Sequence, residues 1–104
     1  MPLALCDGST VDANSLIECT HADQEGRETY NLYQTYDKGS RWHYLDRQVK
    51  DEVLLFKHFD SADVPAKCSP HATFPHTSVP AEHTPRETIE TKVYVFSYPA
   101  PHTR

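Results

Sequence analysis

Glycine and cysteine are both scarce in this chain, and their scarcity excludes several kinds of site. Only three of the 104 residues are glycine, and they are isolated, so a glycine-rich nucleotide-binding loop cannot be built. The three cysteines, Cys6, Cys19 and Cys68, form no CxxC pair, which excludes a zinc ribbon. Because their number is odd and their spacing irregular, they suit a reducing compartment better than a disulfide framework.

Long apolar runs and an excess of basic charge are also lacking. No stretch approaches the roughly 18 apolar residues of a membrane-spanning helix, and Met1 to Cys6 is too short for the apolar region of a signal peptide. The net charge of −5 argues against a nucleic acid as partner. No nucleophile-elbow pattern supports Ser-His-Asp chemistry. We therefore expect a cytoplasmic protein without membrane or nucleic acid partners.

What the chain does contain is typical of one small globular domain, residues 1–104. It is 38% hydrophobic, 11% aromatic and 24% charged. A helix-like segment covers only 11–17, with Asp12 as N-cap and Leu16 and Ile17 facing inward. Prolines recur through 61–85 and favour loops there. Alternating apolar and polar residues predict strands elsewhere, at 28–36, 41–45, 52–59, 71–74 and 87–98.

Four or five short antiparallel strands with long Pro-rich connections predict a mostly-β fold. We expect a partial jelly roll, half of a double-stranded β-helix, with one short helix. Such a half leaves a sheet edge and an apolar face open to solvent. A second copy of the chain is expected to cover them, which makes the protein a homodimer.

Seven histidines raise the question of a metal site. The iron facial triad combines His-x-Asp/Glu with a distal His. Two His-x-Asp motifs occur, His21-x-Asp23 and His58-x-Asp60. Chance alone predicts about one, so neither motif is specific evidence for an iron site. His58 and Asp60 end an apolar strand, where a period of two places them on one face. A metal site, if present, would use His71, His58 and Asp60.

Several charged or polar side chains lie in or beside strands rich in aromatic residues. Small domains rarely place charges there unpaired. One reading is ion pairs at the rim, such as Glu52–Lys57 or Asp60–Arg86. The other is a polar cluster in a concave, aromatic-lined pocket. The residues concerned are Arg41, His43, Lys57, Asp60, His71, Arg86 and Glu90.

A series of short sequence motifs covers nearly the whole chain. The motifs are Pro2–Asp7, Arg27–Asn31, Arg41–Tyr44, Asp51–Lys57, Asp60-Ser61, Pro70–Phe74 and Pro85–Glu90. In these motifs and their order the chain is similar to the C-terminal part of a fungal hydroxylase/desaturase family. That family includes asaB-type enzymes, gibberellin desaturase-like proteins and cephalosporin methoxylase CmcJ-like proteins.

The resemblance implies a jelly-roll fold, a role in fungal secondary metabolism, and Fe(II) with 2-oxoglutarate as cofactors in full-length relatives. By position, His71 would be the distal iron ligand, and Arg86, helped by Thr88, would hold the cosubstrate carboxylate. The chain departs from the family, because the early His-x-Asp and Asn-x-Trp-Arg-Pro segments are absent. Ser40 also replaces a typical His, and Lys92 a typical Arg. We expect a truncated member that has lost iron-dependent oxidation.

The sequence therefore favours a cofactor-independent cyclase or isomerase of fungal natural-product biosynthesis, for example a pericyclase such as a Diels–Alderase, acting on a small hydrophobic intermediate. Such catalysis needs a pocket that holds the substrate in a reactive shape, and one or two hydrogen-bond donors. Two alternatives remain: an Fe(II)/2-oxoglutarate hydroxylase/desaturase whose metal site is rebuilt within the chain or across a dimer, and a non-catalytic accessory or binding subunit. The catalytic candidates are His71, Arg86, Arg41, Lys57 and Asp60. The substrate-binding candidates are Trp42, His43, Tyr30, Tyr44, Phe74 and Thr88.

Overall fold

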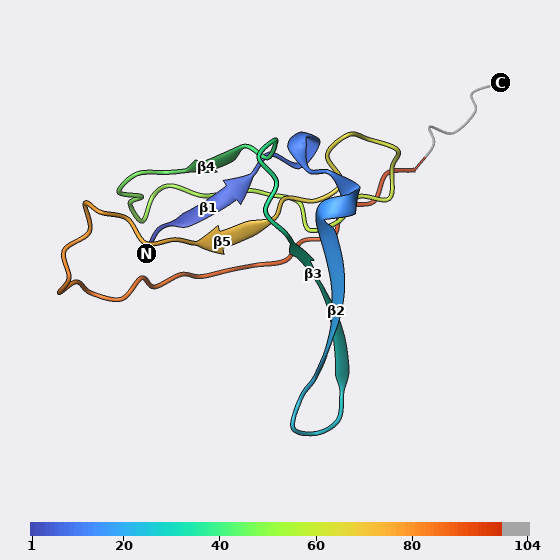
Figure 1. Cartoon of the computed structure of the whole chain (residues 1–104), viewed down its shortest axis with the longest axis horizontal. Helices are drawn as coiled ribbons and strands as arrows, with labels where there is room; N and C mark the ends of the chain where they lie inside the picture. Colours follow the sequence, from blue (N-terminus) through green and yellow to red (C-terminus); the bar gives the residue numbers. More distant parts are fainter. Residues whose placement is uncertain (99–104) are drawn as a thin grey trace.

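The fold is mostly β, as predicted, with two antiparallel sheets and two single 3-10 turns (Figure 1). The computed structural model describes residues 1–98. The strands are β1 (Leu3–Cys6), β2 (Leu16–Ala22), β3 (Glu28–Gln34), β4 (Trp42–Tyr44) and β5 (His71–Thr73), and the 3-10 turns are η1 (Gly8–Thr10) and η2 (Ala13–Ser15).

The larger sheet has three strands in the order β4-β1-β5, with β1 in the centre. Its register places Ala4 opposite both Tyr44 and Ala72, and Leu5 opposite both His43 and His71. Residues directly opposite in an antiparallel pair share a face, and successive residues alternate between faces. The sheet therefore has a cavity face, which carries Tyr44 and Ala72, and an imidazole face, which carries His43 and His71.

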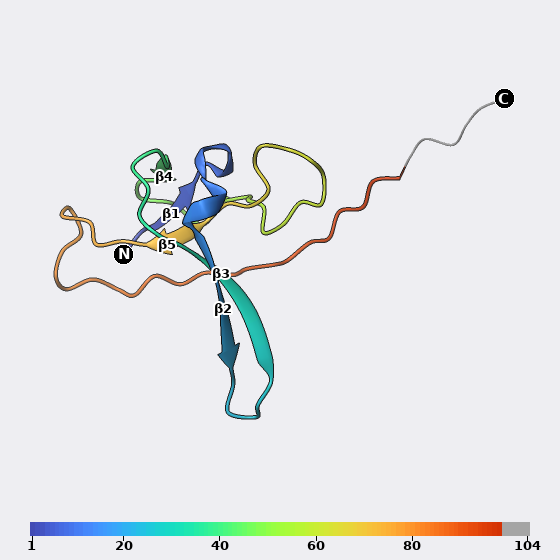
Figure 2. The same ribbon diagram turned by 45° about the vertical axis from the view of Figure 1, so that its right-hand side comes forward.

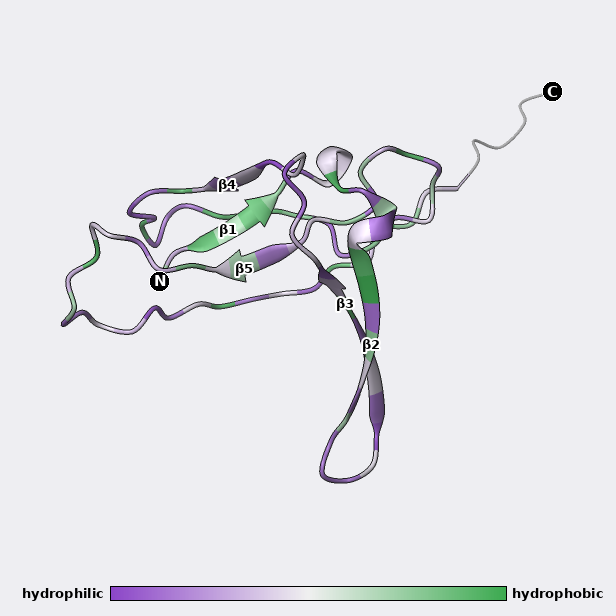
Figure 3. Ribbon diagram, in the orientation of Figure 1, coloured by the Kyte–Doolittle hydropathy of each residue, from purple (hydrophilic) through white to green (hydrophobic). Residues whose placement is uncertain are grey.

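Strand β1 is the most hydrophobic part of this sheet (green in Figure 3) and holds the small core. Ala4 and Cys6 are the buried apolar side chains, at 8% and 2% exposure. The end of β1 is tied down on both sides: the N–H of Cys6 donates to the Pro70 carbonyl (2.8 Å), and that of Asp7 donates to the Arg41 carbonyl (2.8 Å). These bonds fix β4 and β5 against the central strand.

Strands β2 and β3 form a hairpin that projects away from the three-stranded sheet in both views (Figures 1 and 2). Its loop is organised by the Asp23 carboxylate, which accepts from the backbone N–H groups of Glu25 (2.9 Å) and Arg27 (2.8 Å). Gly26 supplies a positive φ of 78° at the turn, a conformation that glycine adopts without steric cost. The apolar side chains on this arm, such as Tyr30 and Leu32, are exposed.

The predicted helix at 11–17 is wrong in extent. Asp12 caps the segment as expected, with its carboxylate accepting from the N–H of Asn14 (2.9 Å), but the helical part is only the 3-10 turn η2. Leu16 and Ile17 instead begin strand β2 and pair with Gln34 and Tyr33. Residues with β-branched side chains favour a strand once a partner strand is present.

The strands predicted at 28–36, 41–45 and 71–74 are confirmed as β3, β4 and β5, but those at 52–59 and 87–98 are not formed. Leu55 and Ile89, in these two segments, are 95% and 100% exposed. An alternating pattern makes a segment suitable for a sheet, but a strand also needs a partner for its backbone hydrogen bonds. Within residues 1–98 neither segment pairs with another strand, although the Lys57 carbonyl accepts one bond, from the N–H of Ser69 (2.9 Å). The sequence also predicts a frayed tail at 99–104, and these residues lie outside the described ones.

Across the described part of the chain, no helix has the length and apolar character needed to span a membrane.

Candidate functional site

A cavity of about 350 Å³ opens on the cavity face of the three-stranded sheet. The small side chains of Ala4 and Ala72 leave room at its floor, and the aromatic rings of Tyr44 and Phe74 pack edge to face beside it, with centroids 5.1 Å apart. Four of the six predicted substrate-binding residues meet here. The lining residues are Ala4, Trp42, His43, Tyr44, Ala72 and Phe74.

Two polar residues that the sequence did not single out, His76 and Ser78, complete this site. The hydroxyl of Tyr44 lies 2.9 Å from Nε2 of His76, and the hydroxyl of Ser78 lies 2.6 Å from Nδ1. The His76 ring also contacts Phe74, with centroids 5.9 Å apart. A period of two continued past β5 would have placed His76 on the same face as Phe74 and was the available signal.

The imidazole face carries a second group of rings, formed by Phe56, His58 and His71. Phe56 lies 4.8 Å from His71 between ring centroids, and His58 lies 5.6 Å from His71. The carbonyl of Ser69 lies 3.2 Å from Nδ1 of His71 and can only accept, so Nδ1 carries the proton. This leaves the Nε2 lone pair of His71 available to a metal or a proton.

The side chains on this face that could bind a metal do not by themselves make up an iron site. Asp60, the predicted carboxylate ligand, pairs with Lys57 (2.5 Å) instead of joining His58 and His71. That hydrogen bond, and a second from the N–H of Ala62, lower the pKa of the Asp60 carboxyl below its ordinary value. No cluster of three or more His, Cys, Asp or Glu side chains in residues 1–98 could hold a metal ion.

The remaining predicted site residues lie elsewhere in the described chain. Lys57 also donates to the Ala66 carbonyl (3.1 Å), which commits it to a loop, and the Arg41 backbone is engaged at the end of β1. Tyr30 lies on the projecting hairpin opposite Thr20. Arg86 and Thr88 lie in the extended segment after Pro85, and within residues 1–98 no ion pair or side-chain hydrogen bond links them to His71.

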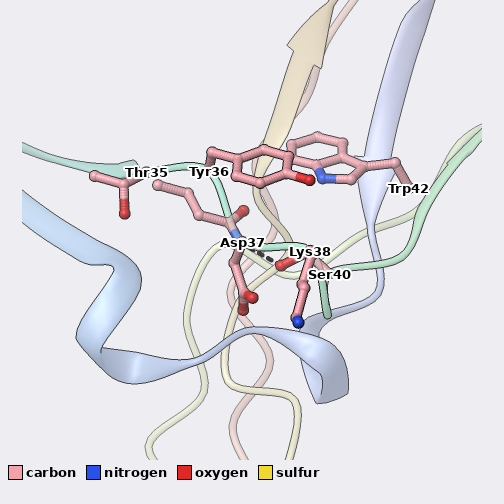
Figure 4. Close-up of a pocket in the computed structure, with 7 residues that line it drawn as sticks. Thr35, Tyr36, Asp37, Lys38, Ser40 and Trp42 are labelled. Carbon is pink, nitrogen blue, oxygen red and sulfur yellow. Dashed lines mark hydrogen bonds between the residues drawn. The ribbon is translucent and has the colours of Figure 1, made fainter.

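A second cavity, of about 320 Å³, lies beside the loop that joins β3 to β4 (Figure 4). Trp42 lines this cavity as well as the first. Gln34 donates from Nε2 to the Ser40 hydroxyl (2.7 Å), and its buried Oε1 has no partner within the described residues. Most of the residues that line this second cavity have polar side chains, whereas the cavity on the sheet face is lined almost wholly by apolar atoms, so the latter is the better match to an apolar ligand. The polar lining residues are Gln34, Thr35, Asp37, Lys38 and Ser40.

The chain matches the oxidoreductase/YMDC permease-like domain, YDMC, over residues 1–96. It is 36% identical over 96 residues to the Fe(II)/2-oxoglutarate-dependent dioxygenase nvfI of Aspergillus novofumigatus. It is 33% identical over 105 aligned residues to the hydroxylase/desaturase CTB9 of Cercospora beticola, and 33% over 100 to the aspirochlorine biosynthesis protein N of Aspergillus oryzae.

Each of these alignments covers 91% of this chain but only 34%, 32% and 41% of the relative, in that order, so the chain spans about a third of their length. No solved structure matches. The relatives are oxidoreductase- and hydroxylase-type proteins of fungal secondary metabolism, which confirms the resemblance drawn from the sequence motifs. The chain therefore belongs to the YDMC oxidoreductase-like family, together with fungal asaB-type hydroxylase/desaturases and Fe(II)/2-oxoglutarate dioxygenases.

Proposed function

We propose that this chain binds a small apolar intermediate of fungal secondary metabolism in the cytoplasm and promotes its cyclisation or isomerisation without a cofactor. The observation that carries the proposal is the cavity on the sheet face, where Trp42, Tyr44 and Phe74 meet over a floor of Ala4 and Ala72. An apolar cavity with a few polar groups at its edge is typical of a small-molecule site.

The cavity can favour a ring-forming or bond-shifting reaction by holding a flexible molecule in one folded shape. Aromatic walls restrict such a ligand through contact area and ring stacking. Holding the reacting ends close together removes part of the entropic barrier, and a positioned hydrogen-bond donor can stabilise charge that develops on an oxygen atom. Proton transfer, where the reaction requires it, falls to a nearby imidazole.

An iron-dependent oxidation is a second candidate, favoured by a different observation on the opposite face. His71 donates its Nδ1–H to a backbone carbonyl, an arrangement common among metal-binding histidines, and His58 lies beside it. Several relatives are also named as dioxygenases or hydroxylases. Two imidazoles are an incomplete iron site, so further ligands would have to come from outside this cluster, for example from a second copy across a dimer.

One experiment separates the two candidates. The gene is deleted in its host, the accumulated intermediate is isolated, and the purified protein is incubated with it before and after removal of metal by a chelator. We expect the same product at the same rate in both samples, and at least a tenfold lower rate for Trp42→Ala, which removes the largest wall of the cavity.

The opposite outcome is equally clear. If the protein binds one equivalent of iron, loses turnover with the chelator and forms succinate from 2-oxoglutarate in step with product, the metal-free proposal is wrong. In that case His71→Ala should abolish iron binding. His21→Ala is the control, because His21 pairs with Tyr33 on the projecting hairpin, outside both the cavity and the Phe56–His58–His71 group.

A further inference from the structure

We propose that the Tyr44 hydroxyl donates a hydrogen bond to a carbonyl oxygen of the molecule bound in the cavity, and that His76 and Ser78 orient it to do so. The inference rests on the proposed function only in using the same cavity. It adds a chemical class of ligand, an apolar molecule with a ketone or enone carbonyl at one end.

The proton on His76 can be placed from its contacts. The backbone N–H of Ser78 points at Nδ1 of His76 at 3.2 Å, and a backbone N–H can only donate. Nδ1 must therefore present its lone pair, and the Ser78 hydroxyl at 2.6 Å donates to the same atom. In the neutral ring the remaining proton lies on Nε2.

This tautomer determines what Tyr44 can do. The Nε2–H of His76 donates to the Tyr44 hydroxyl oxygen (2.9 Å), so that oxygen acts as an acceptor in this contact. A phenol that accepts one hydrogen bond still carries its own O–H. In the described chain His76 is the one hydrogen-bond partner of this hydroxyl, so the O–H is free for a ligand.

The surroundings hold this donor at the edge of an apolar space. Phe74 packs against Tyr44 edge to face, and the His76 ring lies 5.4 Å from that of Tyr44 between centroids. Trp42 and Ala72 line the same cavity and offer no acceptor from their side chains. Tyr44 is 43% exposed, so its O–H faces water when the cavity is empty. A carbonyl oxygen on an otherwise apolar ligand would replace that water as the acceptor.

A fixed phenol donor also has a chemical consequence. It draws electron density from a conjugated carbonyl and stabilises negative charge that develops on the oxygen. Tyr44 is thus the group that would touch the reacting molecule, whereas His76 and Ser78 act through it as positioning residues.

The test uses prodan, an apolar naphthyl ketone whose fluorescence emission shifts to longer wavelength when its carbonyl accepts a hydrogen bond. Prodan is titrated into the full chain and into variants. We expect Tyr44→Phe to weaken binding about three- to tenfold and to shift the bound emission to shorter wavelength. His76→Leu should shift the emission in the same direction with a smaller loss of affinity. His76→Gln, whose amide can still donate to Tyr44, should restore the emission.

Tyr33→Phe is the matched control, because Tyr33 forms a similar pair with His21 (2.9 Å) on the hairpin, away from the cavity. It should change neither affinity nor emission. If Phe74→Ala, which changes only the cavity on the sheet face, abolishes prodan binding but Tyr44→Phe leaves affinity and emission unchanged, the hydrogen-bond inference is wrong while the cavity stands. If Phe74→Ala has no effect on prodan binding either, the cavity itself, and with it the proposed function, is contradicted.

Discussion

Tyr44 and His71 show how single residues on neighbouring strands serve different faces of one sheet. Tyr44 lies in the row with Ala4 and Ala72 and lines the apolar cavity. His71 lies one residue out of that row, opposite Leu5, and contacts Phe56 on the other face. Because alternation separates them, the Tyr44 hydroxyl serves the cavity and the His71 imidazole serves the opposite face, where it could bind a metal.

Gly8 is a residue at which the backbone leaves no room for a side chain. A Cβ there would collide with the carbonyl oxygen of Cys68 and approach Cβ of Ala66 at 3.2 Å. The obstacle is backbone and cannot rotate away. We expect Gly8→Ala to lower the free energy of unfolding by about 1–3 kcal/mol, a typical cost of overpacking.

Gly39→Ala is the matched control for this prediction. Its added Cβ would meet only the Asp37 carboxylate, at an ordinary 3.5 Å, so a change within about 0.5 kcal/mol is expected. Chemical denaturation measured by circular dichroism gives both values. Equal stabilities for the two variants would show that the chain between η1 and Cys68 does not pack as described.

The β2–β3 hairpin is an element whose stability depends on one side chain in its loop. The hydrogen bonds from the backbone N–H and the side chain of Arg27 lower the pKa of the Asp23 carboxyl below its ordinary 3.8. Because the carboxyl has a lower pKa in the folded hairpin than in the unfolded chain, its ionised form stabilises the hairpin at any pH above the unfolded-state pKa. This stabilisation is lost as the pH falls through the folded-state pKa.

We therefore expect Asp23→Ala to raise the hydrogen-exchange rates of β2 and β3 amides about three- to tenfold at neutral pH. The difference from the wild-type chain should shrink below pH 4, as the wild-type carboxylate is protonated. Asp37→Ala is a suitable control, because Asp37 makes a comparable turn bond to the N–H of Gly39 (3.0 Å) outside the hairpin. Unchanged exchange in Asp23→Ala would contradict this role for the loop.

The whole molecule exposes far more surface than its mass requires. Its accessible surface is 9833 Å², whereas a compact monomer of 11.9 kDa exposes about 5,900 Å², a difference of about 3,900 Å². Its radius of gyration is 17.5 Å, against about 13 Å for a compact domain of this length. The excess is comparable with the area buried in permanent interfaces.

We propose that a second copy of the chain covers this surface, and light scattering should then give twice the 11.9 kDa of the single chain. One exposed apolar row, Ile89 with Val93 and Val95, is our candidate for the interface. Ile89→Asp should weaken dimerisation at least tenfold. Lys92→Asp is the control and should have little effect, because position 92 lies in the same segment but outside the row of 89, 93 and 95. A wild-type chain that remains monomeric at high concentration would show that a second copy does not cover it.

Much of the fold followed from local chemistry. The alternation of Tyr and Thr at 28–36, the aromatic residues around Trp42 and the short segment at His71 each predicted a strand that is present. Asp12 is the cap expected of it. Strand β1 was not predicted, since four residues are too few for a periodic signal, and the segments at 52–59 and 87–98 failed because pairing depends on residues distant in the chain.

By itself, the sequence determined the mostly-β class, the family and four of the residues that meet in the cavity, because composition, motif order and aromatic spacing are local properties of the chain. Only the tertiary structure decided which side chains share a face. It separated His71 from Tyr44, paired Asp60 with Lys57 and brought His76 to the Tyr44 hydroxyl. The physical reason is strand register, which is set between distant segments and assigns every side chain to one face of the sheet or the other.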